Sequence, residues 1–158
     1  MAERKPWVSC TGYVRRELEA NVFDAAVGRC HQILDLGLPV TVSFSGGKDS
    51  TCVLMLMLGV ARERGVLPLE VVMVDEEVID PDTIAYASEV ASWPDVTFRW
   101  ICAPIRHTLR ARGRTHWYTW DPAERDVWAR ELPPHAITAD QLEYDWDRAS
   151  YGDVITAY

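Results

Sequence analysis

Residues 40–50 read VTVSFSGGKDS, and this stretch decides the fold. Its first five residues are rich in β-branched side chains, which is typical of a buried strand. The two glycines predict a tight turn, because glycine has no side chain to restrict the backbone. Residues 50–64 are apolar at most positions and are followed by Gly65, which predicts a buried helix with a left-handed glycine cap. A strand, a glycine turn and a helix are typical of an α/β sheet.

The flanking sequence extends this pattern in both directions. Residues 11–36 have apolar positions at roughly helical spacing, with a candidate break at Gly28. Strands are expected over residues 69–74 and 96–102. Between them, a helix is expected from Asp80, which can act as its cap, to about residue 93. The alternation predicts an α/β fold with a doubly wound, mostly parallel, Rossmann-like sheet and helices on both faces.

The last third of the chain is less regular. We expect a short helix or loop over residues 104–112, an irregular segment over 113–120, and helices beginning at Asp121 and Thr138, the first ending before Pro133. Residues 154–158 predict a last strand. The chain is therefore expected to be one domain over residues 1–158. Its parts would be an N-terminal helical segment (1–37), a βαβαβ core (38–112) and a tryptophan-rich lid with the last strand (113–158).

The formal charge of -8 argues against a protein that grips nucleic acid with its whole surface. Residues 96–120, however, contain no Asp or Glu. Their basic residues are Arg99, Arg106, His107, Arg110, Arg112, Arg114 and His116. Arg106 and Arg114 are our candidates for binding an anion such as phosphate or sulfate, and a plain exposed face is the alternative. Contact with nucleic acid is expected only through the strip at residues 99–114.

The cysteines and the apolar segments indicate where the protein resides. Cys10, Cys30, Cys52 and Cys102 are scattered, without the paired spacing of a metal or iron–sulfur site. Reduced thiols in a cytoplasmic protein are the expected state. The longest uncharged apolar run, residues 50–61, is shorter than the ~20 residues of a membrane span. We expect neither a signal peptide nor a membrane segment.

The turn at residues 45–50 predicts a phosphate site, because α/β sheets bind ligands where a strand leads into a helix. Its glycines let backbone amides approach a phosphate, and the first helical turn adds free N–H groups and positive partial charge. Ser45 and Ser50 can add hydroxyl donors, and Lys48 adds a full charge.

The turn does not fit the Walker A pattern. Val42 stands where that pattern has its first glycine, and Asp49 follows the lysine directly. An aspartate there would repel phosphate unless a cation lay between them, so we expect Mg²⁺ near Asp49. Capping the helix is an equally good use of this residue.

Residues 43–51, SFSGGKDST, resemble the PP-loop of the adenine nucleotide α-hydrolase-like superfamily, and most closely that of the phosphoadenosine phosphosulfate (PAPS) reductase family. Residues 72–77, VMVDEE, resemble the family's second strand and its acidic end. Residues 117–122, WYTWDP, and 128–133, WARELP, are similar to PAPS-reductase-like proteins of phage and prophage. The resemblance covers most of the chain from about residue 30.

The resemblance implies that ATP, PAPS or a related adenylate lies across the first two strands with its phosphates on the loop. Lys48 and Asp49 are the implied catalytic residues. Asp75, at the end of the second strand, is expected to contact ribose or Mg²⁺, whereas for Glu77 we favour a solvated acidic turn. The predicted nucleotide-binding residues are Ser43, Phe44, Ser45, Gly46, Gly47, Lys48, Asp49, Ser50 and Asp75.

The resemblance also leaves several functions open. Family members cleave ATP between the α and β phosphates and release pyrophosphate, whereas the reductases bind a ready-made sulfonucleotide. The reductases' nucleophilic cysteine in a Glu-Cys-Gly segment has no counterpart here, nor do the cysteine pairs that bind iron–sulfur clusters. We therefore favour an ATP pyrophosphatase in sulfur or nucleic-acid modification over a phosphoadenylyl-sulfate reductase. A non-catalytic nucleotide-sensing module is the alternative, and a tRNA-modifying enzyme ranks lower.

The family's substrate motif, of the type Gly-x-Arg-x-x-Glu-Ser, would follow residues 154–158 and is not present in the sequence. A minimal version of the fold, a longer chain, or a protein partner that completes the site would each account for this. Assembly into a homo-oligomer also stays open.

Overall fold

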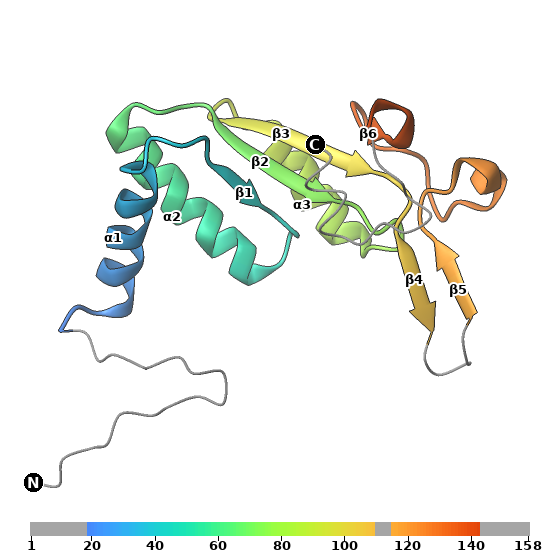
Figure 1. Ribbon diagram of the computed structural model, residues 1–158, viewed down its shortest axis with the longest axis horizontal. Helices are drawn as coiled ribbons and strands as arrows, with labels where there is room; N and C mark the ends of the chain where they lie inside the picture. The colour runs from blue at the N-terminus through green and yellow to red at the C-terminus, as the bar shows by residue number, and fades with distance from the viewer. Residues whose placement is uncertain (1–18, 110–114, 143–158) are drawn as a thin grey trace, which may run out of the picture. The chain divides into compact units, whose positions relative to one another are not determined.

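The computed structural model describes residues 19–109 and 115–142 (Figure 1). The chain forms two compact units, one up to Gly37 and one from Leu38. The described part of the first unit, residues 19–37, contains helix α1 (Val22–Leu34), whose N-cap Asn21 accepts a hydrogen bond from the Asp24 amide at 2.9 Å. The helix predicted over residues 11–36 therefore begins later, at this cap, and it continues through Gly28. Residues 11–18 lie outside the described residues.

The second unit contains a four-stranded parallel sheet, which confirms the predicted α/β class. Its strands follow the order β1 (Thr41–Ser43), β2 (Leu69–Val74), β3 (Val96–Cys102) and β6 (Ile137–Thr138). The first three match the predicted strands, with β1 shorter at both ends than the predicted 40–44. Strand β6, only two residues long, was not predicted.

Two helices connect the first three strands. Helix α2 (Lys48–Arg64) ends at Gly65, which has φ 66° as the predicted cap requires, and it begins two residues before the predicted Ser50. Helix α3 (Pro81–Ala91) begins at the predicted cap, where Asp80 accepts a hydrogen bond from the Asp82 amide at 2.9 Å. Both starts lie at the carboxyl edge of the sheet.

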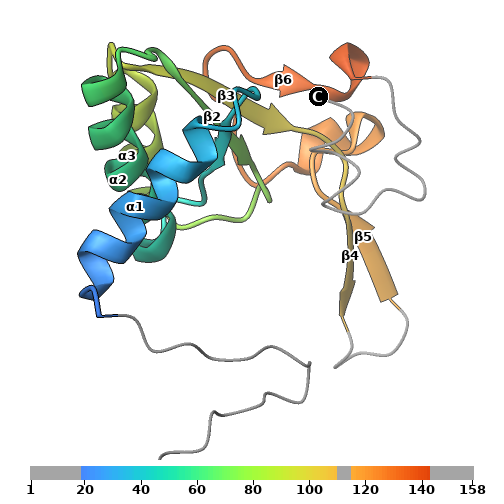
Figure 2. The same cartoon turned by 60° about the vertical axis from the view of Figure 1, so that its left-hand side comes forward.

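The helices α2 and α3 cover one face of the sheet (Figure 2). The chain steps in the same direction from β1 to β2 to β3, and right-handed crossovers then place both helices on the same side. On this face Phe44 packs on Tyr86 of α3, with ring centroids 5.9 Å apart, and on Phe98 of β3 at 6.0 Å. The sheet core is thus built against one helical layer.

The opposite face differs from the prediction of helices on both faces. Thr41 and Ser43 are exposed there, and near the carboxyl edge a small apolar cluster covers it instead. The buried members of that cluster are Val72, Val74, Ile101, Ala103 and Ile105. Helix α2 is also less buried than predicted, since Val53 and Met55 are about half exposed. In the described part of this unit, the second helical layer is therefore missing.

The region after β3 was predicted incorrectly as a helix or loop followed by an irregular segment. It contains strands β4 (Arg106–Leu109) and β5 (Thr115–Tyr118), which pair antiparallel in a sheet of their own. Strands of four residues leave a weak signal, because RHTL and THWY are too short to show a clear alternation of polar and apolar residues.

The remaining turns of helix begin as predicted but are shorter. Asp121 caps η2 (Pro122–Val127) by accepting a hydrogen bond from Ala123 at 2.8 Å, but η2 is a 3₁₀ helix interrupted at Glu124. A capping box between Thr138 and Gln141 begins η3 (Ala139–Gln141). The last predicted strand, 154–158, lies outside the described residues. No helix within residues 19–109 and 115–142 has the length and apolar character to cross a membrane.

Candidate functional site

The predicted phosphate loop joins β1 to α2, and its backbone requires glycine. Gly46 has φ 73°, a conformation that side chains other than glycine rarely adopt. A Cβ atom at this position would lie 2.5 Å from Cγ2 of Thr83, near the start of α3. Gly47 is the N-cap of α2 and has extended backbone angles. The loop is therefore pressed against the next helix at a position that only glycine fits.

Side chains within the loop hold its shape. Oγ of Ser50 accepts a hydrogen bond from the Ser45 amide at 3.2 Å and lies 3.0 Å from Oγ of Ser45. It also donates to the carbonyl of Gly47 at 3.0 Å. A loop braced in this way keeps its donors in place before a ligand arrives, which lowers the entropic cost of binding.

The loop presents positive charge to solvent. The first intrahelical bond of α2 runs from the Thr51 amide to the Gly47 carbonyl at 3.0 Å, so the amides of residues 48–50 precede the helical bonding pattern. Lys48 and Asp49 lie on the surface, with 87% and 91% of their side chains exposed, and Nζ is 2.9 Å from Oδ1. Exposed ion pairs contribute little, so a ligand can draw Lys48 away at small cost.

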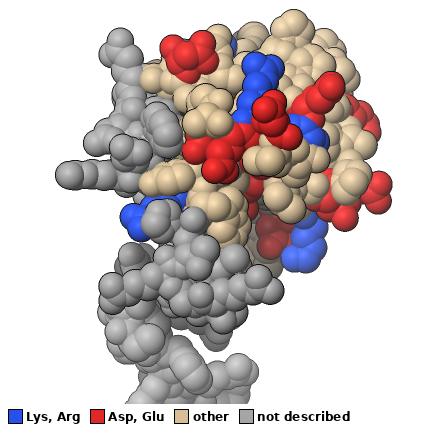
Figure 3. Space-filling model, turned by 90° about the vertical axis from the view of Figure 1, so that its right-hand side faces the viewer, with Lys and Arg blue, Asp and Glu red and all other residues tan. Residues whose placement is uncertain are grey.

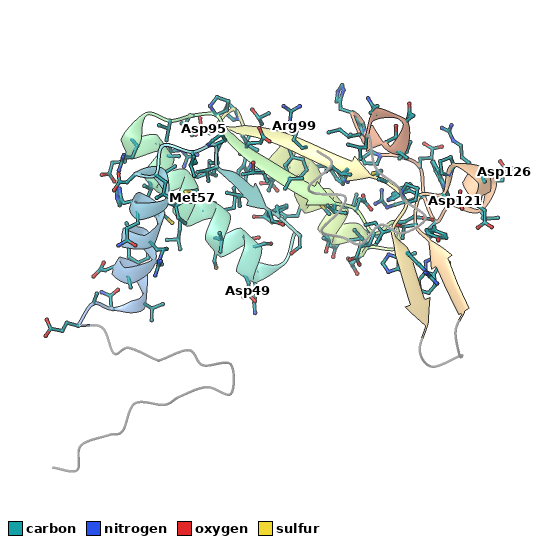
Figure 4. The ribbon with its side chains drawn as sticks, viewed as in Figure 1. Asp49, Met57, Asp95, Arg99, Asp121 and Asp126 are labelled. Carbon is teal, nitrogen blue, oxygen red and sulfur yellow. The ribbon has the colours of Figure 1, made fainter. Side chains whose placement is uncertain are left out.

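Asp49 points away from the protein at the start of α2 (Figure 4). Mg²⁺ in nucleotide sites is commonly held by one or two carboxylates together with phosphate oxygens and water. A single exposed carboxylate beside a phosphate loop fits that use, and Asp49 is the residue that would hold the ion. Within the described ranges, no group of three or more His, Cys, Asp or Glu residues could hold a metal ion without a ligand's help.

Ser43 and Phe44, two of the predicted nucleotide-binding residues, differ in exposure. Ser43 is exposed on the sheet face opposite α2 and α3. The ring of Phe44 is buried in the core, and its amide donates to the Val72 carbonyl at 2.8 Å. Phe44 therefore anchors the start of the loop in the core, and its ring is not accessible to a ligand.

Asp75, predicted to contact ribose or Mg²⁺, lies inside the protein. Its side chain is fully buried, and Oδ1 accepts a hydrogen bond from the Glu77 amide at 2.8 Å. Oδ2 accepts one from Nε1 of Trp100 at 2.6 Å and forms an ion pair with Arg130. Both oxygens are thus engaged within the protein, and we assign Asp75 to this network rather than to the ligand.

The prediction that Glu77 lies in a solvated turn is wrong. Its side chain is nearly buried, and its oxygens accept hydrogen bonds from the amides of Trp120 and Ala129, each at 2.7 Å. Arg130 completes this arrangement through Nε, which is 3.1 Å from the Glu77 carbonyl. We call Asp75, Glu77 and Arg130 the buried clamp. Sequence reasoning missed it because its partners are more than 40 residues apart in the chain.

The buried clamp holds the tryptophan-rich segment against the carboxyl edge of β2. The Arg130 guanidinium lies 4.9 Å above the ring of Trp120, whose Nε1 donates to the Asp75 carbonyl at 2.9 Å. Trp128 packs edge-on against Trp120 at 5.2 Å. Trp120 is therefore buried against the sheet edge.

A cavity of about 410 Å³ lies beside this segment. Cys102, Trp120, Trp128 and Leu132 contribute to its wall, together with polar residues of η3 and its cap. Burial raises the pKa of the Cys102 thiol, and the negative charge of Asp75 raises it further. The thiol therefore stays protonated, which makes Cys102 a poor nucleophile.

We expect a thiol-alkylating reagent at pH 8 to modify Cys52, which is exposed, while sparing the buried Cys30 and Cys102 until the protein unfolds. Peptide mapping by mass spectrometry checks this.

The folded protein also holds the Cys102 proton more tightly than the unfolded chain does, because the thiol of the unfolded chain has its ordinary pKa of 9.0. This contribution to stability is present below that value and falls as the pH rises above it. Rapid labelling of Cys102 in folded protein would contradict its burial.

The predicted anion-binding arginines are separated from the loop in the chain. Arg106 is exposed at the start of β4, on the antiparallel pair rather than on the main sheet. Arg114 lies outside the described residues.

Comparison with known proteins identifies a relative in Escherichia coli. No protein-family model matches the chain, and no solved structure matches it. The chain is similar to YbdN, an uncharacterized protein of Escherichia coli strain K12, with 34% identity over 126 residues. The matched region covers 77% of this chain, and the chain spans 30% of the length of YbdN.

Proposed function

We propose that this chain is a PP-loop protein that binds ATP or a related adenylate, such as PAPS, with its phosphates on residues 45–50. The observation that carries the proposal is the backbone at Gly46, which only glycine fits, followed directly by the N-terminus of a 17-residue helix. Amides at a helix N-terminus, two serine hydroxyls and an exposed lysine form an anion site. The resemblance to PP-loop proteins supports an adenine nucleotide as the anion.

We further propose that bound ATP is cleaved between its α and β phosphates. An acceptor nucleophile attacks the α-phosphorus, the bond to the bridging oxygen breaks, and pyrophosphate leaves with the electron pair. Lys48 and the amides of residues 48–50 stabilise the charge that develops on the leaving pyrophosphate. Asp49 would hold Mg²⁺, which neutralises phosphate charge when bound.

The described cysteines favour this chemistry over thiol-based reduction. Cys30 and Cys102 are buried, and burial raises the pKa of both thiols. Cys52 is exposed, on the second turn of α2. A reductase would need an activated thiolate beside the substrate, and neither buried thiol supplies one.

Lys48→Ala is expected to weaken ATP binding by about 10- to 150-fold, because a hydrogen bond to a charged group contributes about 1.5–3 kcal/mol. Isothermal titration with ATP and Mg²⁺ measures this. Arg29→Ala is the matched control, because it removes one positive charge from an exposed position on α1. Equal affinity of the Lys48→Ala variant and the parent would overturn the proposed phosphate site.

The lysine content allows a direct test of where the phosphates lie. The sequence contains two lysines, Lys5 and Lys48. An ATP analogue with an acyl group on its γ-phosphate transfers that group to a nearby lysine amine and releases ATP. We expect acylation of Lys48, suppressed by excess ATP, and no ATP-dependent change at Lys5. Pyrophosphate release, measured in parallel, then separates an enzyme from a nucleotide-sensing module, which would bind without turnover.

A further inference from the structure

Three acidic residues follow β2 in a row, and the middle one, Glu76, takes no part in the buried clamp. Asp75 and Glu77 on either side of it are buried, whereas Glu76 is exposed. Its carboxylate makes no hydrogen bond or ion pair with any residue in the ranges 19–109 and 115–142. A carboxylate without a partner, between two that are fully engaged, is available to a ligand.

The backbone on both sides of Glu76 is held by hydrogen bonds. The Glu76 carbonyl accepts one from the Val78 amide at 2.7 Å, and the Glu77 amide donates to Oδ1 of Asp75 at 2.8 Å. The side chain of Glu77 is held in turn by the amides of the tryptophan-rich segment. The Glu76 carboxylate is therefore presented from an ordered backbone, which lowers the entropic cost of contact with a ligand.

The elements on either side of Glu76 both reach the phosphate loop. Before it, β2 pairs with β1, and the Phe44 amide at the start of the loop donates to the Val72 carbonyl at 2.8 Å. After it, the first turn of α3 lies against the loop, where Thr83 would contact a Cβ atom on Gly46. Glu76 thus lies at the carboxyl edge of the sheet, on the strand next to the one that leads into the loop.

This edge is where the ribose of a bound nucleotide would lie. In dinucleotide-binding sheets, an acidic residue about 20 positions after the phosphate loop hydrogen-bonds a ribose hydroxyl. Glu76 follows the last loop residue, Ser50, by 26 positions. Asp75 was the predicted ribose contact, but its carboxylate is engaged in the buried clamp, so Glu76 is the acidic residue that remains for this contact.

The same edge is unfavourable for an additional phosphate. Residues 75–83 contain five acidic residues and no basic one, and Asp80 and Asp82 are exposed like Glu76. Acidic side chains also gather on the side of the molecule toward which β2 and β3 point (Figure 3). A phosphate on the ribose would therefore meet negative charge, whereas a hydroxyl would find an acceptor.

We propose that Glu76 hydrogen-bonds the ribose hydroxyls and that the chain thereby selects ATP over nucleotides with a 3′-phosphate, such as PAPS. The inference rests on the proposed function, because it takes the nucleotide phosphates to lie on residues 45–50. It narrows that function to adenine nucleotides with free ribose hydroxyls. A 3′-phosphate is disfavoured twice, since it removes a hydroxyl donor and adds charge beside a carboxylate.

Two sets of matched ligands test the inference on the full chain, by isothermal titration in the presence of Mg²⁺. The first set is ATP, 2′-deoxy-ATP and 3′-deoxy-ATP. At least one deoxy form should bind about 10- to 150-fold more weakly than ATP, the loss expected for one hydrogen bond to a charged group. The second set is adenosine 5′-phosphosulfate and PAPS, which differ only in the 3′-phosphate. PAPS should bind at least about tenfold more weakly, because it places like charges together.

Variants of Glu76 attribute these preferences to its carboxylate. Glu76→Ala should bind ATP and both deoxy forms with equal affinity. Glu76→Gln keeps a hydrogen-bond acceptor without the charge, so it should retain part of the preference for ATP over the deoxy forms and lose much of the preference against PAPS. Glu89→Ala is the matched control, because it removes an exposed glutamate near the end of α3, and it should leave every preference unchanged. Circular dichroism verifies that each variant is folded.

The inference and the proposed function fail in different ways. No binding of ATP by the parent protein would overturn both. ATP binding with equal affinity for both deoxy forms, or PAPS binding as tight as that of adenosine 5′-phosphosulfate, would overturn the role of Glu76 and leave the phosphate loop unaffected. An equal loss of affinity for all five ligands in Glu76→Ala would also overturn it, because an effect on Mg²⁺ or on the fold does not distinguish one ribose from another.

Discussion

Arg130→Ala is expected to lower the free energy of unfolding by about 3–5 kcal/mol. The Asp75 carboxylate is fully buried, and Arg130, whose side chain is 22% exposed, is its ion-pair partner. Removing the guanidinium leaves that charge inside the protein without its counter-ion. It also removes the hydrogen bond to the Glu77 carbonyl and the cation that lies over Trp120. Urea unfolding followed by tryptophan fluorescence measures the loss.

Two comparisons attribute the effect to the buried charge. Arg125→Ala removes a guanidinium that lies 5.3 Å from the ring of Trp128 on the surface, and it should cost about 0.5–1 kcal/mol. The double variant Asp75→Asn with Arg130→Met removes both charges, so it should be less destabilised than Arg130→Ala alone. A loss below 1 kcal/mol for Arg130→Ala would show that water or another group compensates Asp75.

Gly46→Ala is expected to weaken ATP binding at least tenfold. The positive φ of Gly46 costs a residue with a Cβ about 1–2 kcal/mol, and that Cβ would lie 2.5 Å from Cγ2 of Thr83. Either the Thr83 side chain or the loop backbone must shift to relieve this contact, and the strained φ favours a shift of the loop, which moves the amides that precede and begin α2. Isothermal titration with ATP and Mg²⁺ measures the change, and thermal unfolding reports whether the fold persists.

The same helix offers the control for that substitution. Nothing lies within 4 Å of a Cβ placed on Gly59, so Gly59→Ala in α2 should raise stability by about 0.5–1 kcal/mol and leave ATP binding unchanged. Adding Thr83→Ser to Gly46→Ala removes Cγ2 and should restore part of the affinity, although the strained φ remains. Unchanged ATP binding in Gly46→Ala would mean that the loop amides do not hold the phosphates.

The features that the sequence predicted well depend on neighbouring residues. The glycine turn, Gly65 at the end of α2 and the caps Asp80 and Asp121 each involve contacts within a few positions. Such local signals are visible in one sequence, because side chain and backbone partner lie within a single turn.

The features that the sequence could not predict depend on distant contacts. Glu77 has the composition of a solvated turn, and only the approach of Trp120, 43 positions later, makes it a buried acceptor. Asp75 ends a strand at the expected edge, yet Arg130, 55 positions later, decides what its carboxylate contacts. Which distant segment packs on a given edge follows from the three-dimensional arrangement, and helical or strand periodicity does not encode it.

The buried clamp also has a consequence for local unfolding. Asp75 and Glu77 lie at one end, and residues 129–130 at the other, of a stretch that includes α3, β3, β4 and β5. Proteins open locally in contiguous cooperative units, and we expect the buried clamp, which joins the two ends of this stretch, to make it one such unit. The described amides of this stretch should therefore become accessible to solvent exchange together, so that the stability of the sheet edge and that of the β4–β5 pair are thermodynamically linked.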